Sequence, residues 1–219
     1  SIAAHLDLTD TLFERCEIAG PGFLNFYLSQ RYYGEIVKDV MAKGGDYGKS
    51  DYGSEKKVLV EFVSANPTGP MHIGNARGGA IGDCLAAVLE WAGYDVRREF
   101  YVNDAGNQIE KFATSLEVRY LQLYKDGIEL PEDAYKGADI TEHAKNFAAE
   151  YGDRYVDADS KERRDALVAY ALPKNIEGLQ NDLLEYRIKY DNWFKESTLH
   201  ADGSVDKIIN KFKELGVTY

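Results

Sequence analysis

One short stretch of the sequence holds the residue types that phosphate chemistry needs. His72 and Gly74 stand two residues apart, at the opening of a helix predicted to begin near Asn75. The first N–H groups of a helix lack partners within it, and together with the helix dipole they favour phosphate. An imidazole beside them can donate a hydrogen bond to a phosphoryl oxygen as charge builds at the reacting phosphorus. A glycine there lets a flat ring such as adenine approach the backbone, so the stretch favours a nucleotide site.

The elements around this stretch are those of a β-α-β unit. Residues 58–63 form a short apolar run, typical of a strand buried on both faces of a parallel sheet. A loop with two prolines covers 64–71, and a helix over about 75–92 stops at Gly93. One face of that helix is apolar: Ile81, Leu85, Val88 and Leu89. Residues 96–102 are the next predicted strand, so we expect a right-handed unit with the loop at the carboxyl edge of the sheet, where such folds bind ligands.

We interpret residues 1–50 as the end of a small α+β domain together with a linker. The turn at residues 20–22 introduces a strand over 23–28. Ser29 can then cap a helix whose apolar positions recur at helical spacing. Those positions are Tyr33, Ile36, Val37, Val40 and Met41. Gly44 and Gly45 end the helix.

Residues 51–219 predict an α/β fold, the first half of a Rossmann-like parallel sheet with a helical insertion at about 126–190. A helix that starts near Asn107 should bury Ile109, Phe112, Leu116 and Leu123. The insertion is rich in charge and in helix formers, and Pro173 should break it. A final helix over 204–215 stops at Gly216.

The bulk composition excludes several classes of protein. A hydrophobic content of 44% and an aromatic content of 12% in 219 residues are typical of a globular chain. No apolar run approaches the roughly 18 residues that span a bilayer, and no secretion signal is visible. Cys16 and Cys84 lie far apart without metal spacing, which indicates reduced, mostly buried thiols in a cytoplasmic protein. The net charge of −11 argues against a chain that itself grips nucleic acid by neutralising phosphates.

Four stretches resemble arginyl-tRNA synthetases. Residues 64–75, Ser-Ala-Asn-Pro-Thr-Gly-Pro-Met-His-Ile-Gly-Asn, look like the first signature of class I aminoacyl-tRNA synthetases, in the form found in bacterial arginyl enzymes. Residues 100–109 and 191–205 also resemble that family. Residues 19–26 resemble the end of the extra N-terminal domain that marks the arginyl enzymes. The resemblance implies that 51–219 is the first half of the catalytic domain.

The resemblance implies roles for the nucleotide-binding residues. His72, Gly74, Asn75 and Thr68 would bind ATP, and His72 would help to stabilise the α-phosphate while adenylate forms. Asn75 would assist from the helix start. Many class I enzymes have histidine where this chain has Asn75, so His72 must supply the imidazole alone.

The resemblance also implies an amino-acid site. Ser64 and Asn66 look like the residues that hold the backbone of arginine, and Glu61 like part of guanidinium recognition, since a carboxylate pairs well with that planar fork of donors. The alternative for Glu61 is a structural charge at a strand end.

Asn103, Asp104 and Gln108 are further pocket candidates, because the first two follow the second strand at the same sheet edge. Residues 104–107 are equally typical of a turn that caps the next helix.

The activity that the resemblance implies is arginine–tRNA ligation in two steps. L-arginine and ATP, accompanied by Mg²⁺, would give arginyl-adenylate, and the arginyl group would pass to tRNA(Arg). No tightly bound cofactor, protein-held metal or membrane is implied, and the whole enzyme would be a cytoplasmic monomer. The family's second ATP signature and its anticodon-binding domain are not found here. We therefore expect a fragment that is inactive alone, and the main RNA-binding surface to lie outside it.

Two other functions stay open at this point. One is an enzyme that adenylates a small acid without RNA, and the other is a non-catalytic binding module related to synthetases. The remaining polar features have simpler interpretations. His5, His143 and His200 are interpreted as solvated or packed side chains. The charged run at residues 161–164 is interpreted as a solvated helical face, with a tRNA contact as the alternative.

Overall fold

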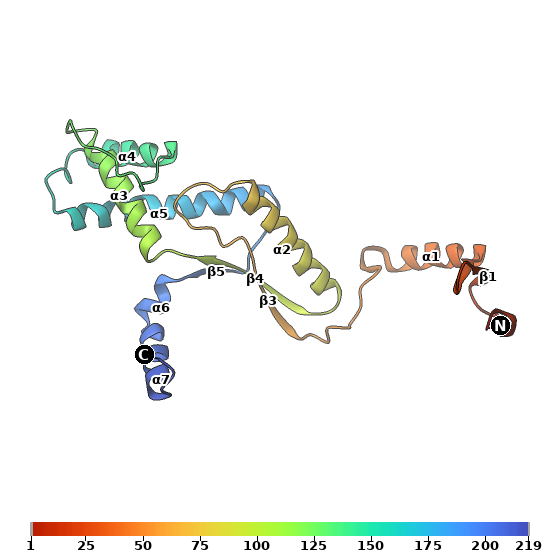
Figure 1. The fold of residues 1–219 in the computed structure, drawn as a ribbon. Coiled ribbons are helices and arrows are strands. Elements are labelled where there is room, and N and C mark those ends of the chain that lie inside the picture. Colours follow the sequence, from red (N-terminus) through yellow and green to blue (C-terminus); the bar gives the residue numbers. More distant parts are fainter. Residues whose placement is uncertain (1, 219) are drawn as a thin grey trace. The chain divides into compact units, whose positions relative to one another are not determined.

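The computed structural model describes residues 2–218 and divides after Ser50 into two compact units (Figure 1). In the first unit, a 3-10 helix η1 (Ile2–His5) precedes the antiparallel hairpin of β1 (Phe13–Ala19) and β2 (Phe23–Leu28). Then come α1 (Gln30–Lys43) and the short η2 (Gly44–Asp46).

The predicted strand over 23–28 and the helix after it are confirmed, and Gly44, with φ of 51°, ends α1. Ser29 holds the N-cap position of α1, but its side chain makes no capping hydrogen bond. β1 was not predicted.

The second unit contains a three-stranded parallel sheet. Its strands are β3 (Lys57–Glu61), β4 (Asp95–Val102) and β5 (Asn192–Lys195), in the order β3-β4-β5. The helix α2 (Ile73–Trp91) connects β3 to β4, so the predicted β-α-β unit is confirmed. Gly93, at φ of 86°, follows the end of α2 as expected. β5 was not predicted, because only four residues, Asn-Trp-Phe-Lys, carry it.

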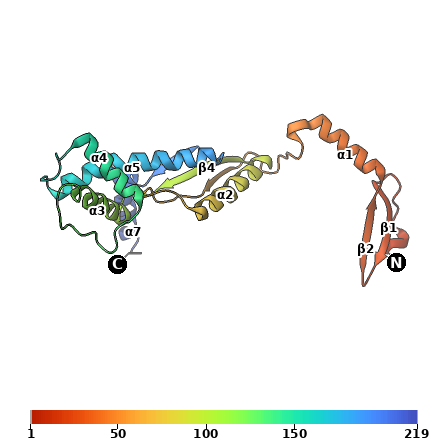
Figure 2. The same cartoon turned by 90° about the horizontal axis from the view of Figure 1, so that it is seen from above.

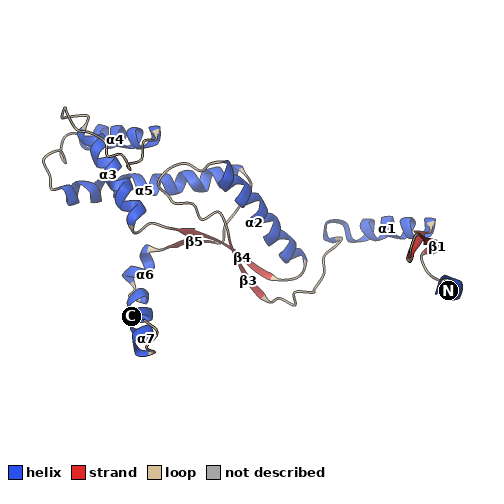
Figure 3. Ribbon diagram, viewed as in Figure 1, coloured by secondary structure: helices blue, strands red, loops and turns tan. Residues whose placement is uncertain are grey.

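Helices make up most of the rest of the second unit (Figure 3). They are α3 (Asn107–Leu121), α4 (Ala138–Tyr151), α5 (Ser160–Glu185), α6 (Ser197–Ala201) and α7 (Ser204–Glu214). No helix within residues 2–218 is long and apolar enough to cross a membrane.

The helix α5 takes part in two hydrophobic cores. Its first half packs with α3 and α4, where Leu167 and Ala171 are buried among Phe112, Leu116, Tyr120, Ile140 and Phe147. Its second half packs on the sheet and α2, where Leu179 and Leu183 are buried with Val60, Phe62, Phe100 and Val102. Figure 2 shows α3, α4 and the start of α5 gathered at one end of the second unit, and α2 at the other end of α5.

Contrary to the prediction, Pro173 does not break the helical insertion. It lies inside the continuous helix α5, between the residues that enter the first core and those that enter the second. An internal proline removes one helical hydrogen bond and crowds the preceding turn. Burial on both sides of Pro173 outweighs that local cost.

The packing of α2 differs from the prediction. Its buried residues are Gly79, Gly82 and Ala86, whereas Ile81, Leu85 and Val88 of the predicted apolar face are 51–65% exposed. The reason is that the glycine face of α2 lies close to the side chain of Phe62. A Cβ on Gly82 would lie 2.2 Å from Cγ of Phe62, so the aromatic ring occupies the space that a larger residue would need.

Four smaller expectations were wrong. β3 is an edge strand in the described sheet and Leu59 is 57% exposed, so the strand is not buried on both faces. Leu123 follows the end of α3 and is exposed. Cys84 is exposed as well.

The fourth concerns the charged run at 161–164. Arg163 is only 8% exposed and donates from Nη2 to Glu117 Oε1 at 2.8 Å, while Arg164 donates from Nε to Glu117 Oε2 at 2.6 Å. The run is therefore in part a buried ion cluster between α3 and α5.

Candidate functional site

The loop after β3 begins with a strained turn. β3 ends at Glu61, and Val63 and Ser64 have left-handed backbone, with φ of 65° and 43°. Such values are uncommon for any residue with a side chain, and for a β-branched valine they are a genuine outlier. Strained backbone persists where surrounding contacts over-determine it, and it clusters at functional sites.

Hydrogen bonds hold this turn against the neighbouring strand. The hydroxyl of Ser64 donates to Glu61 Oε1 at 2.7 Å and accepts from the backbone N–H of Tyr101, on β4, at 3.1 Å. Ser64 therefore ties the carboxyl end of β3 to β4. The loop that follows, residues 64–71, is called the signature loop below.

His72 is the N-cap residue of α2, and its ring is held by the first turn of that helix. Its Nδ1 accepts from the N–H of Gly74 at 3.1 Å, and its own N–H donates to Asn75 Oδ1 at 3.0 Å, which makes a reciprocal capping box. Because Nδ1 acts as an acceptor, a neutral ring carries its proton on Nε2. The cap thus leaves an N–H donor on the far side of the ring.

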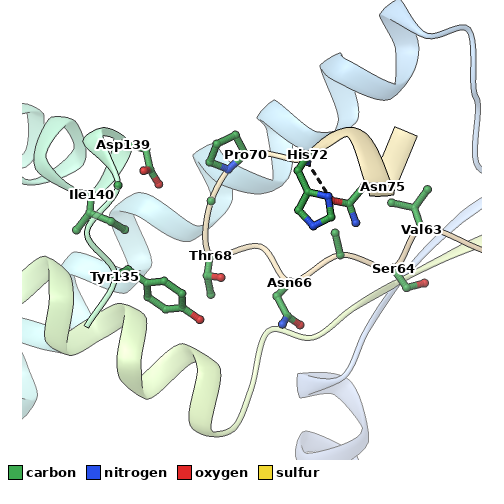
Figure 4. Close-up of a pocket in the computed structure, with 13 residues that line it drawn as sticks. Val63, Ser64, Asn66, Thr68, Pro70, His72, Asn75, Tyr135, Asp139 and Ile140 are labelled. Carbon is green, nitrogen blue, oxygen red and sulfur yellow. Dashed lines mark hydrogen bonds between the residues drawn. The ribbon is translucent and has the colours of Figure 1, made fainter. Parts of the chain in front are cut away.

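The signature loop forms one wall of a cavity of about 650 Å³ (Figure 4). Residues of the predicted site that line it are Ser64, Asn66, Thr68, His72 and Asn75. The opposite wall includes Tyr135, from the segment before α4, and Asp139 and Ile140, from the first turn of α4. Sequence reasoning did not single out Tyr135 or Asp139, because they come from a different part of the chain.

The other predicted residues lie next to this lining. Gly74 lies beneath the His72 ring, where a Cβ would be 2.9 Å from Cε1. Glu61 does not line the cavity, but it accepts a hydrogen bond from Ser64, which does. Gln108 accepts a hydrogen bond from the hydroxyl of Tyr135.

Asn103 and Asp104 belong to a polar group at the ends of β4 and β5. Asp104 does not cap α3, whose N-cap residue is Gly106. Instead its two carboxylate oxygens accept from the N–H and the hydroxyl of Ser197, both at 2.8 Å. The amide of Asn103, with its nitrogen toward Glu196, donates to Glu196 Oε2 at 2.6 Å.

Negative charge gathers around this group. Partial burial, followed by the carboxylates of Glu196, Glu61 and Asp104, raises the pKa of the Tyr101 hydroxyl. Three carboxylates, each just at or after the end of a different strand, therefore surround the Tyr101 hydroxyl with negative charge. Such surroundings suit a cationic ligand. Sequence reasoning missed Glu196 because it follows the undetected strand β5.

The described residues contain no group of three or more His, Cys, Asp or Glu side chains that could hold a metal ion.

Two family models match the sequence. The model described as tRNA synthetases class I (R), catalytic domain, covers residues 36–187, which is well over half of the chain. The model of the arginyl tRNA synthetase N terminal domain covers residues 1–28. The chain belongs to the class I tRNA synthetases of the arginine type. The resemblance found in the sequence is thereby confirmed.

Similar proteins carry the corresponding name. The arginine–tRNA ligase of Caldanaerobacter subterraneus subsp. tengcongensis is 55% identical over 218 residues, and that of Acetivibrio thermocellus is 53% identical over 220 residues. Both matches cover 100% of this chain and 39% of the relative. The chain of this synthetase-family member therefore spans about two fifths of the length of these curated relatives.

Solved structures show the same fold. A putative arginyl-tRNA synthetase from Campylobacter jejuni matches with a TM-score of 0.72 and 32% identity, over 85% of this chain and 40% of that one. The Thermus thermophilus arginyl-tRNA synthetase matches with a TM-score of 0.61 over 97% of this chain and 34% of that one, at 21% identity, which is evidence for the fold alone. The predicted α/β fold with a parallel sheet and additional helices is confirmed.

Proposed function

We propose that this chain is the part of an arginine–tRNA ligase that holds ATP and L-arginine while arginyl-adenylate forms. The observation that carries the proposal is the cavity at the carboxyl end of β3. Ser64, Asn66, Thr68, His72 and Asn75, all chosen from the sequence for this chemistry, line that one cavity. Parallel α/β sheets bind their ligands at this edge.

His72 is proposed to act on the α-phosphate of ATP. In adenylate formation a carboxylate oxygen of arginine attacks the α-phosphorus in line, a new P–O bond forms, and the bond to pyrophosphate breaks. Negative charge builds on the phosphoryl oxygens during this step. The capping contact with Gly74 keeps Nδ1 as an acceptor, so Nε2–H is the donor available to those oxygens. Asn75 supports this role by holding the His72 backbone, and Thr68 and Gly74 complete the ATP side.

The amino-acid end is proposed to lie toward the ends of β3 and β4. Ser64 and Asn66 would hold the backbone of arginine, and Glu61 would pair with its guanidinium. The negative surroundings of Tyr101 support a cationic side chain there, with Glu196 as an additional carboxylate. Asn103, Asp104 and Gln108 would then shape the pocket through the hydrogen bonds described above.

The remainder of the proposal concerns the whole protein. Transfer of the arginyl group to tRNA(Arg), Mg²⁺ bound with ATP as part of the substrate, action in the cytoplasm and a monomeric state follow from the family resemblance. So do the assignments of 1–50 as the end of the N-terminal domain with its linker and of 51–219 as the first half of the catalytic domain. The helical insertion is assigned to about 126–190. We expect the chain alone not to charge tRNA.

The test is an NMR titration of the isotope-labelled chain with a non-hydrolysable arginyl-adenylate analogue. The citrulline analogue is the matched control, because it replaces the charged guanidinium with a neutral urea of the same shape. Amide shifts confined to residues 64–75, and a weaker response to citrulline, support the proposal. An equal response to both analogues removes arginine recognition from this chain, and no response to either overturns the proposed site.

A further inference from the structure

A single hydrogen bond fastens the signature loop to the helices beyond the sheet. The side-chain Nδ2 of Asn175, on α5, donates to the backbone carbonyl of Pro67 at 2.9 Å. Pro67 is fully buried and Thr68 is 9% exposed, so a donor from the protein replaces the water that this carbonyl would otherwise bind. Within residues 2–218, it is the one hydrogen bond that the backbone of residues 65–71 makes.

A second side chain fixes the orientation of the Asn175 amide. His143, on α4, lies with Nε2 at 2.7 Å from Asn175 Oδ1. An amide oxygen can only accept, so Nε2 of His143 is the donor. If the amide turned over, its nitrogen would face the His143 donor and its oxygen would face the Pro67 carbonyl. The Pro67 carbonyl requires the amide nitrogen, and His143 in its Nε2–H tautomer reinforces that orientation by donating to Oδ1. His143 is thus a packed side chain, as expected, with Asn175 as its hydrogen-bond partner.

The position of this pair in the fold gives it a particular effect. Asn175 lies two residues after Pro173, at the place where α5 leaves the core shared with α3 and α4 and enters the core beneath the sheet. His143 lies on the same helix as Asp139 and Ile140, which form the far wall of the cavity. The helices that build one wall thus also hold the loop that builds the other.

We propose that Asn175 and His143 are positioning residues for the signature loop. Neither touches the cavity. Asn175 sets the place of Pro67 and so of Thr68 beside it, and His143 sets Asn175. Their effect on ligand rests on the proposed function, whereas their effect on the loop does not. A site held in one geometry before the ligand arrives binds it more tightly than a loop that must be ordered on binding.

The main test compares two Asn→Asp variants on one helix. Asn175→Asp has nearly the same shape and can still accept from His143, but it offers Pro67 an oxygen in place of a donor. Asn181→Asp makes the same chemical change at an exposed position further along α5. Backbone amide shifts and hydrogen exchange are measured for Asn66, Thr68 and Gly69 in the labelled chain, together with the Kd for the arginyl-adenylate analogue and the Tm.

Asn175→Asp should shift these loop amides, speed their exchange about tenfold and weaken the analogue about tenfold, while Asn181→Asp stays within twofold of the parent. The inference is overturned if the loop amides of the two variants behave alike, even if Asn175→Asp lowers Tm, because that outcome describes a purely structural contact. If the parent chain does not bind the analogue, the proposed function fails. The loop amides then decide the positioning role by themselves.

Two substitutions of His143 provide a second test, which can still be carried out if the Asn175→Asp variant does not fold. His143→Gln retains an N–H donor for Asn175, and His143→Phe retains a planar ring without a donor. Loop exchange close to that of the parent in the glutamine variant, with faster exchange in the phenylalanine variant, supports the proposal. Equal exchange in both variants contradicts it.

Discussion

The imidazole of His72 folds back over the backbone of Gly74, whose N–H donates to its Nδ1 at 3.1 Å. A Cβ at residue 74 would lie 2.9 Å from Cε1 of this ring, closer than carbon atoms approach without displacement. Gly74 therefore matters less for admitting adenine, as expected from sequence, than for leaving space for the histidine itself. If His72 also donates to phosphate as proposed, the helix cap and the phosphate donor would share one ring, and that ring needs glycine at residue 74.

Gly74→Ala should impair binding without harming the fold. The methyl group must push the His72 ring away from its cap, so the analogue should bind at least about tenfold more weakly. Alanine favours a helix interior by roughly 0.5–1 kcal/mol over glycine, and loss of the N-cap costs about as much, so Tm should change little. Long-range ¹H–¹⁵N spectra of the imidazole measure the loss of the Nδ1 acceptor directly. Gly78→Ala is the control, because a Cβ there meets nothing within 4 Å. Equal binding by both variants would refute the role of Gly74.

Gly82→Ala should instead destabilise the second unit. Its Cβ would lie 2.2 Å from Phe62, and overpacking of this kind costs about 1–3 kcal/mol or more. For a chain of this size, each 1 kcal/mol lowers Tm by about 2–4 °C. Thermal unfolding followed by circular dichroism measures the change. With Gly78→Ala as the reference on the same helix, unchanged or higher Tm in Gly82→Ala would show that α2 is not packed as closely as described.

These glycines also show where sequence reasoning succeeds and where it fails. The order β3, α2, β4 and α3 is visible in the sequence, because β-rich runs, helical spacing and the stop at Gly93 are local signals. Which face of α2 is buried is not local. The large residues Ile81 and Leu85 suggested one face, but the closeness of Phe62 selected the face with glycines.

The candidate site divides in the same way. The residues from Ser64 to Asn75 are contiguous, so their chemistry could be recognised from the order of residues alone. Tyr135 and Asp139 reach the cavity only because α3, α4 and α5 pack together, and no local pattern marks them. Glu196 was hidden because β5 is short and carries no periodic signal.

Glu117 should make the stability of the second unit depend on acid pH. Burial raises its pKa, but hydrogen bonds from Ser160, Arg164 and Arg163 outweigh it, and the pKa lies below the ordinary 4.5. A carboxyl whose pKa is lowered on folding stabilises the fold above its unfolded value. That stability disappears as pH falls below about 4.5 and through the lowered pKa.

Glu117→Gln should remove this part of the pH dependence and lower stability at neutral pH by about 3–5 kcal/mol, because the buried Arg163 loses the carboxylate that balances its charge. Denaturant unfolding at pH 7 and at several acid pH values tests both effects. Asp165→Asn breaks the solvent-exposed pair with Lys161 on the same helix and should leave stability nearly unchanged. A pH profile in Glu117→Gln that is parallel to the parent's would exclude Glu117 as its source.

Glu61→Gln should abolish the preference for arginine over citrulline. Glutamine can still accept from the Ser64 hydroxyl, which holds the strained turn, so the variant removes the charge and keeps the loop. A hydrogen bond to a charged group contributes about 1.5–3 kcal/mol, so the arginyl analogue should bind about 10–100-fold more weakly and the citrullyl analogue about as before.

Glu99→Gln is the control, because it removes the same charge from the residue paired with Glu61 across β3 and β4. If Glu99→Gln weakens the arginyl analogue equally, the sheet edge attracts arginine by general charge and Glu61 has no specific part in its recognition. A loss confined to Glu61→Gln would place the guanidinium at the end of β3.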